Sequence, residues 1–183
     1  MVRIFATLMI ILLSPVAQAD VVFPPLTADD LNGRSLNLPA DLPGKPTIVF
    51  IAYKREQQPN FNAWVEQLDL RETDGQAWVE LPVVGRGAVL FRSFVDKGMR
   101  LGITSPQMWA RTITIYSSWS AFNLALGILW RGEIYLALVD PDGTVHALIE
   151  GDVTEGKVEQ LCAAFTPDFI INRLQRIMVL IRH

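Results

Sequence analysis

Residues 46–59, with the sequence PTIVFIAYKREQQP, decide the fold. Residues 47–53 are continuously apolar and rich in β-branched side chains, which is typical of a strand buried on both faces of a parallel sheet. A helix is predicted directly afterwards, over residues 59–72, because its apolar side chains fall on one helical face. The stretch therefore predicts a central strand that runs straight into a helix.

Outward from this stretch, strand and helix patterns alternate. The last two strands are joined by Asp140-Pro141-Asp142-Gly143, a strong hairpin-turn sequence. Ser120 is predicted to cap a helix before these two strands, and Thr154 is predicted to cap a helix after them. The predicted strands are residues 35–38, 77–84, 111–116, 134–139 and 144–149, and the predicted helices are 89–101, 120–126 and one that starts after residue 154. This alternation indicates an α/β domain.

The helix predicted over residues 89–101 carries an apolar stripe. The stripe is made of Leu90, Phe91, Phe94, Val95 and Met99. A stripe of this kind normally packs against a core.

Composition narrows the functional class. The chain has 183 residues, 50% hydrophobic and 19% charged, with a formal net charge of −3. This is enough apolar material for one domain with a sizeable core. No basic surplus exists to neutralise a phosphate backbone, so we expect no nucleic-acid partner.

The first residues predict export. Arg3 precedes the apolar run of residues 4–13, and Ala17-Gln18-Ala19 forms an A-x-A cleavage site. The run is too short to span a bilayer as a helix. We expect residues 1–19 to be a signal peptide cleaved after Ala19, and the protein to be periplasmic or secreted.

The last residues form a separate unit. Residues 166–183 are predicted to be a C-terminal helical extension, apolar almost all round. One interpretation is a helix docked on the domain or on a dimer partner. The alternative is an interfacial helix that contacts a membrane surface.

Two stretches resemble thioredoxin and its thiol-peroxidase relatives. The first is residues 46–59, and the second is residues 132–143 with their hairpin turn. In redox members, C-x-x-C stands at the start of the helix, which stabilises a thiolate. Here Glu56-Gln57-Gln58-Pro59 occupies that place. The cis-proline position of the family falls at Ile134, where we expect a trans bond.

The resemblance implies a thioredoxin-like three-layer α/β/α sandwich with a mixed sheet and an extra C-terminal helix. The thioredoxin-like domain would span residues 20–165. Because both halves of the redox site are absent, we expect no disulfide exchange and favour a non-enzymatic role.

A narrower resemblance is to the mitochondrial ATP synthase assembly factor family. The residues that carry it are 80–82, 94–103, 111–116, 122, 126–128 and 134–151. It implies a chaperone-like role toward a protein partner, in the building of a membrane complex. A signal peptide in place of a mitochondrial presequence departs from the family and leaves the client open.

The candidate partner-binding residues cluster near the former redox corner and the loops facing it. They are Lys54, Arg55, Glu56, Gln57, Trp119, Trp130 and Glu133. Exposed aromatic side chains beside cations suit a protein partner. The alternative for residues 54–56 is a solvated loop.

Other chemistry finds little support. The histidines, His146 and His183, belong to no cluster with metal-ligand spacing, so we predict no metal, no cofactor and no catalytic residue. Cys162 is the only cysteine and is expected to be a buried structural thiol. The alternative function is a thiol-dependent peroxidase-like or oxidoreductase enzyme that uses Cys162.

Overall fold

The structure is a computed structural model that describes residues 21–71, 76–103 and 105–165. The predicted signal peptide and C-terminal extension lie outside these residues. Within the described part, no helix is both long and apolar enough to cross a membrane.

One mixed sheet of seven strands organises the chain. In order across the sheet, the strands are β2 (Ser35–Leu38), β1 (Leu26–Asp30), β5 (Ile113–Ser117), β4 (Trp78–Gly85), β3 (Thr47–Ala52), β6 (Tyr135–Val139) and β7 (Val145–Glu150). Strands β3, β4 and β5 run parallel, and the outer pairs are antiparallel. The predicted mixed sheet is confirmed, and β1 adds a strand within a leading segment that had no strand prediction.

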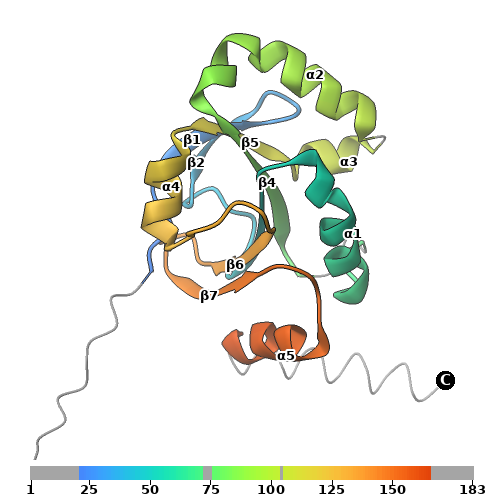
Figure 1. Cartoon of the computed structure of the whole chain (residues 1–183), viewed down its shortest axis with the longest axis vertical. Helices are drawn as coiled ribbons and strands as arrows, with labels where there is room; N and C mark the ends of the chain where they lie inside the picture. The colour runs from blue at the N-terminus through green and yellow to red at the C-terminus, as the bar shows by residue number, and fades with distance from the viewer. Residues whose placement is uncertain (1–20, 72–75, 104, 166–183) are drawn as a thin grey trace, which may run out of the picture.

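The helices lie on both faces of this sheet (Figure 1). They are α1 (Gln58–Gln67), α2 (Arg92–Gly102), α3 (Pro106–Trp109), α4 (Trp119–Leu126) and α5 (Glu155–Ala164), with short 3-10 turns η1 (Arg55–Gln57) and η2 (Arg86–Phe91). Helices α1 and α5 share one hydrophobic cluster, and α4 belongs to the other. The predicted three-layer sandwich is therefore confirmed.

Strand β3 explains why residues 46–59 decide the fold. Val49 and Ile51 point into the α4 cluster, whereas Ile48 and Phe50 point into the cluster of α1 and α5. All four are buried. On the face covered by α1 and α5, Trp64 of α1 donates a hydrogen bond from Nε1 to the Gly151 carbonyl at 3.0 Å. This bond connects α1 to the segment between β7 and α5.

The edge strands of the sheet are short or irregular. Strand β2 has four residues and is followed by Pro39. Strand β7 pairs with β6 through a register shift at Leu138/Val139, and Thr144, just before β7, bridges to Val22.

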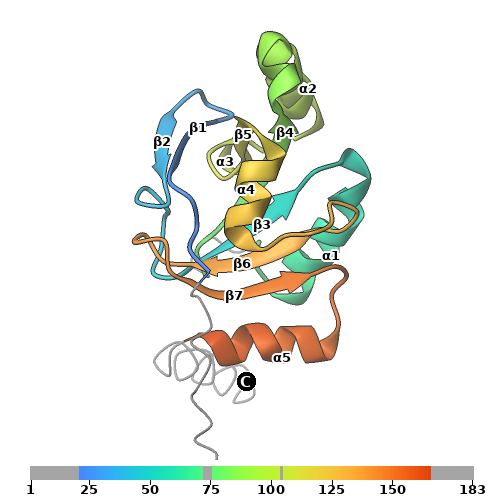
Figure 2. The ribbon, with the colours of Figure 1, turned by 60° about the vertical axis from the view of Figure 1, so that its left-hand side comes forward.

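Two local predictions need correction. Helix α4 begins at Trp119 with Ser118 as its N-cap residue, so Ser120 lies inside its first turn. The helix predicted over residues 89–101 is split, because its first residues form the 3-10 turn η2 and α2 starts only at Arg92. Its apolar stripe mostly faces solvent, because α2 projects beyond the sheet and its inner contacts are polar (Figure 2).

Helix α5 agrees with its prediction at the start but not at its cysteine. The Thr154 hydroxyl accepts a hydrogen bond from the Lys157 amide at 3.4 Å, as expected of an N-cap. Leu161 and Phe165 are buried against the sheet. Cys162 is only partly buried, because Leu161 takes the inward position next to it. The thiol that was expected to be buried is therefore half-buried.

Candidate functional site

The corner between β3 and α1 is built around a buried amide. Gln57 is 5% exposed, and its Oε1 accepts hydrogen bonds from the backbone amides of Tyr53 at 2.7 Å and Lys54 at 3.1 Å. Its Nε2 donates to the Arg131 carbonyl at 3.3 Å. Gln57 therefore joins the corner to the loop before β6, and its side chain lies inside the protein.

The neighbours of Gln57 are on the surface. Lys54, Arg55 and Glu56 are all exposed, and they form the outer rim of the corner. They offer two cations and one carboxylate to solvent.

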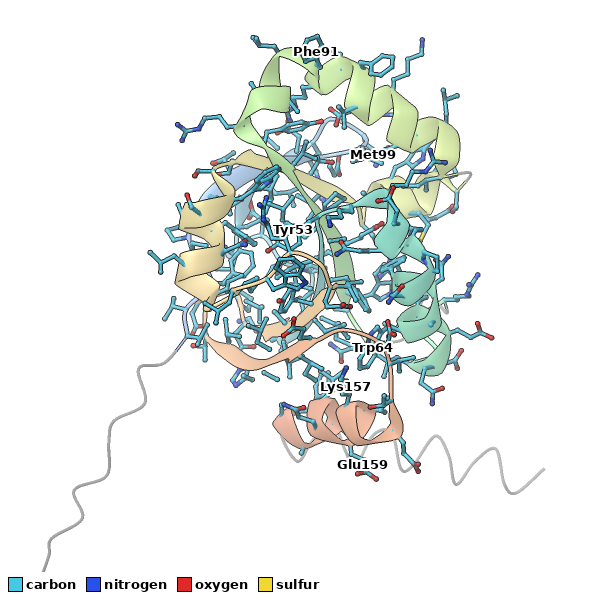
Figure 3. The ribbon with its side chains drawn as sticks, viewed as in Figure 1. Tyr53, Trp64, Phe91, Met99, Lys157 and Glu159 are labelled. Carbon is cyan, nitrogen blue, oxygen red and sulfur yellow. The ribbon has the colours of Figure 1, made fainter. Side chains whose placement is uncertain are left out.

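A hydrogen bond from the Tyr53 side chain connects the corner to α4. Tyr53 Oη donates to Asn123 Oδ1 at 2.6 Å, and Asn123 is buried. Burial raises the pKa of Tyr53 above its ordinary value, so the hydroxyl stays a donor. Figure 3 shows Tyr53 between α4 and α1, in the middle of the molecule.

The loop before β6 is held by the hydroxyl of a second tyrosine, Tyr135. Tyr135 Oη lies 2.6 Å from the Trp130 carbonyl and 2.9 Å from Glu150 Oε1. Burial, followed by the bond to Glu150, raises the pKa of Tyr135 to about 12. Trp130 itself is exposed and Glu133 is half-buried, so the loop carries both candidates beside the corner.

An open hollow of about 460 Å³ lies between the end of β4, the start of α4 and Arg131. Its lining residues are Gly85, Arg86, Gly87, Ser118, Trp119, Ser120, Asn123 and Arg131, and we name it the Arg86–Arg131 hollow. The Arg131 guanidinium lies over the Trp119 ring, 4.0 Å from its centroid. The lining includes two arginines and neither Asp nor Glu, so the hollow favours a partner that carries negative charge.

Of the predicted site residues, Trp119 lines the hollow and Gln57 is joined to it through Arg131, whereas Lys54, Arg55, Glu56, Trp130 and Glu133 are not part of its lining. Arg131 contacts Trp119 through its guanidinium and Gln57 through its carbonyl. The same residue therefore contacts both α4 and the corner. Sequence analysis did not identify Tyr53, Arg86, Asn123 or Arg131 as site residues. Their separation in the chain hides them, since they meet only when β3, β4 and β5 pair in parallel and β6 pairs antiparallel to β3.

Two further sequence features lie away from this hollow. Cys162 is in α5, and the corner itself holds no thiol. The cis peptide bonds of the described chain precede Pro39 and Pro46, so the bond before Ile134 is trans, as predicted. No cluster of His, Cys, Asp or Glu suited to a metal ion occurs within residues 21–71, 76–103 and 105–165.

Solved structures resemble this fold at low sequence identity. A protein from Aquifex aeolicus with a proposed role in electron transfer has a TM-score of 0.56 and 15% identity, with 80% of this chain and 96% of that chain covered. BsSco, a member of the Sco family of cytochrome c oxidase assembly proteins, has a TM-score of 0.53 and 11% identity, with 80% and 94% covered. The exposed lipoprotein thioredoxin Etrx1 from Streptococcus pneumoniae has a TM-score of 0.51 and 14% identity, with 78% and 100% covered.

These likenesses define the class of fold. The chain is a thioredoxin-like α/β protein without the C-x-x-C pair. No protein-family model and no curated protein matches the sequence. The resemblance to the ATP synthase assembly factor family therefore rests on the quoted residues alone.

Proposed function

We propose that this chain is a non-redox binding protein with a chaperone-like role toward a protein partner. The proposed binding surface is the Arg86–Arg131 hollow together with the rim of the adjoining corner, Lys54, Arg55 and Glu56. We further propose that the protein acts after export, in the periplasm or outside the cell.

One observation carries the proposal. Gln57 stands where a redox thioredoxin has its C-x-x-C pair, and its amide is bonded to Tyr53, Lys54 and Arg131. A thiol active site needs an accessible sulfur that can be attacked. A buried amide with three partners instead makes the corner a fixed surface, which suits binding better than exchange.

The charge of the surface indicates what it would bind. Arg86 and Arg131 are exposed in the hollow with Trp119, Lys54 and Arg55 are exposed on the rim of the corner, and Glu56 is the one carboxylate of that rim. Arg and Trp are the side chains that most often dominate the affinity of protein interfaces. An acidic segment of a partner, with carboxylates on the arginines and an apolar residue on Trp119, fits this composition.

The finer proposal is assembly of a membrane complex. It is supported by the resemblance to the ATP synthase assembly factor family, which extends over residues 80–151 in several pieces.

Cross-linked capture tests the binding role. The tagged full chain is cross-linked in its own host, captured, and read by mass spectrometry beside an Arg131→Glu/Trp119→Ala variant. Leu129→Ser is the matched control, because Leu129 is on the same loop as Arg131, fully exposed, and outside the hollow. We expect one complex to be enriched with the wild type and with Leu129→Ser, and lost with Arg131→Glu/Trp119→Ala. Equal enrichment with all three chains would contradict the proposed surface.

A further inference from the structure

Helix α2 is attached to the domain by its polar side. Arg92 Nη2 lies 2.6 Å from Asp29 Oδ2 of β1, and Tyr116 Oη of β5 donates to Asp96 Oδ1 at 2.7 Å. The Arg92 guanidinium also lies 5.1 Å from the centroid of the Tyr116 ring. These contacts turn Arg92 and Asp96 toward the sheet, where a surface helix usually places apolar side chains.

The opposite side of the segment is apolar and exposed. Leu90, Phe94 and Leu101 are 89%, 79% and 77% exposed. Phe94 and Leu101 are seven residues apart and therefore lie on one side of α2, and Leu90 lies in η2 just before the helix. Phe91 is also exposed, and Figure 3 shows it on the outer side of the segment, whereas Met99 lies on the side turned toward the sheet. Exposed apolar side chains gathered on one face mark an interaction surface.

Cations border this apolar face. Arg86, Lys97 and Arg100 are exposed, whereas Asp96, the only carboxylate of residues 86–102, is turned inward to Tyr116 and Arg92. With four cations and one carboxylate, residues 86–102 carry a net charge of +3, although the whole chain carries −3. The segment is therefore a basic, apolar projection on an acidic protein.

We propose that the η2–α2 surface, made of Leu90, Phe91, Phe94 and Leu101 with Arg86, Lys97 and Arg100, binds the surface of an anionic lipid bilayer. The axis of α2 would lie in the membrane plane, with the apolar side chains among the acyl chains and the cations at the headgroups. Helix α2 has 11 residues, too few to span a bilayer.

Two features favour a bilayer over a protein groove or a second copy. The segment projects from one end of the molecule, as Figures 1 and 2 show, so that a flat surface can reach it without touching the rest of the fold. The charge asymmetry also sets the orientation, because an anionic surface attracts residues 86–102 and repels the acidic remainder. The surface is distinct from the Arg86–Arg131 hollow except at Arg86, and the inference does not depend on the proposed function.

Vesicle flotation tests the inference with the full chain. The vesicles contain about 30 mol% phosphatidylglycerol in phosphatidylcholine, and pure phosphatidylcholine vesicles serve as the neutral comparison. We expect binding to the anionic vesicles that weakens as salt rises from ~0.1 M to ~0.5 M. Phe94→Ser/Leu101→Ser is expected to bind at least about ten-fold more weakly, because two apolar side chains no longer enter the bilayer.

Controls separate this surface from other sources of binding. Leu124→Ser/Leu129→Ser removes two equally exposed apolar side chains outside α2 and is expected to bind like the wild type. Lys97→Gln/Arg100→Gln keeps the apolar face, and we expect affinity to fall about five-fold for each cation lost. Circular dichroism and urea unfolding serve to check that each variant is folded.

Three results would overturn the inference. The first is no binding of the wild type to anionic vesicles. The second is equal binding by the wild type and Phe94→Ser/Leu101→Ser, which would place the contact elsewhere, for instance in residues 166–183. The third is a concentration-dependent dimer, seen by light scattering, that the double serine variant abolishes, which would assign the face to a second copy.

Discussion

The guanidinium carbon of Arg131 lies 4.0 Å from the centroid of the Trp119 ring. Arg131 lies between α4 and β6, and Trp119 is the first residue of α4, so this contact joins the segment before β6 to the start of the preceding helix. The backbone carbonyl of Arg131 also receives the Gln57 amide. Arg131 therefore connects the hollow to the corner between β3 and α1. The first two predictions concern residues next to these contacts.

We predict that position 85 must be glycine for the Trp119 ring to keep its place. A Cβ atom at Gly85 would lie 2.6 Å from Trp119 Cζ2, which is too close for two carbon atoms. Gly85→Ala is expected to displace the ring from Arg131 and to lower the free energy of unfolding by about 1–3 kcal/mol in urea titrations. Gly87→Ala is the matched control, since nothing lies within 4 Å of a Cβ there. Equal stability of the two variants would show that the ring moves without cost.

Gln57 is predicted to stabilise the corner. Gln57→Ala leaves the part-buried backbone amides of Tyr53 and Lys54 without their acceptor, and we expect the free energy of unfolding to fall by about 1–3 kcal/mol in total. The neighbouring Gln58 is exposed, so Gln58→Ala is expected to change the free energy of unfolding by less than about 0.5 kcal/mol. Urea unfolding measures the free energy of unfolding of both variants. A Gln57→Ala variant as stable as the wild type would show that the Gln57 amide does not stabilise the corner.

Glu80 is predicted to make stability fall with rising pH. Burial raises the pKa of this carboxyl from 4.5 to about 7, although a hydrogen bond with Thr112 lowers it in part. Between these values the folded protein keeps a proton that the unfolded chain has released. The free energy of unfolding therefore decreases across this window, by about 3 kcal/mol once the pH exceeds the folded pKa.

Glu80→Gln tests this dependence. The variant is expected to unfold at similar urea concentrations at about pH 5 and about pH 8, whereas the wild type loses stability at the higher pH. Glu66→Gln, at an exposed position of α1, is the matched control and should behave like the wild type. If Glu80→Gln keeps the wild-type slope, another group is responsible.

Cys162 distinguishes the binding role from the thiol-dependent alternative. If the proposed function holds, Cys162→Ser captures the same partner as the wild type, and neither chain consumes hydrogen peroxide in the presence of a thiol reductant. The partial exposure of Cys162 makes this assay necessary. Peroxide turnover that disappears in Cys162→Ser would establish the enzyme instead.

The signal peptide is predicted to be removed after Ala19. Intact-mass measurement of the chain from the periplasmic fraction of a bacterial host should give a protein that begins at Asp20. Ala19→Arg is expected to block this processing, because the cleavage site needs a small residue there. Recovery of the uncut chain from the membrane fraction would favour an anchor.

The elements that sequence alone predicts are those with an unambiguous local pattern. Strand β3 is apolar throughout because both faces are covered, and the β6–β7 turn has the residues that its backbone demands. Sequence periodicity misassigned α2 because it finds an apolar stripe but not what covers it. Whether Phe94 meets a core depends on where β5 and β1 place the helix.

The site was predicted in part for the same reason. Glu56, Gln57 and Trp119 stood out by type and position, but Gln57 proved to be an interior residue. Arg131 and Asn123 lie 74 and 70 positions from Gln57 and Tyr53, and no local pattern marks such pairs.

The two edges of the sheet limit how copies of this protein can associate. A strand edge invites another chain to continue the hydrogen-bond ladder when it is long, flat and regular. Strand β2 offers four residues before Pro39, which has no amide proton to donate, and the β6–β7 ladder is interrupted by its register shift. Fibre-like growth by added strands is thereby discouraged at both ends. Any specific association of this chain is left to side chains, whose affinities selection can tune residue by residue, and not to the backbone, which is the same in every protein.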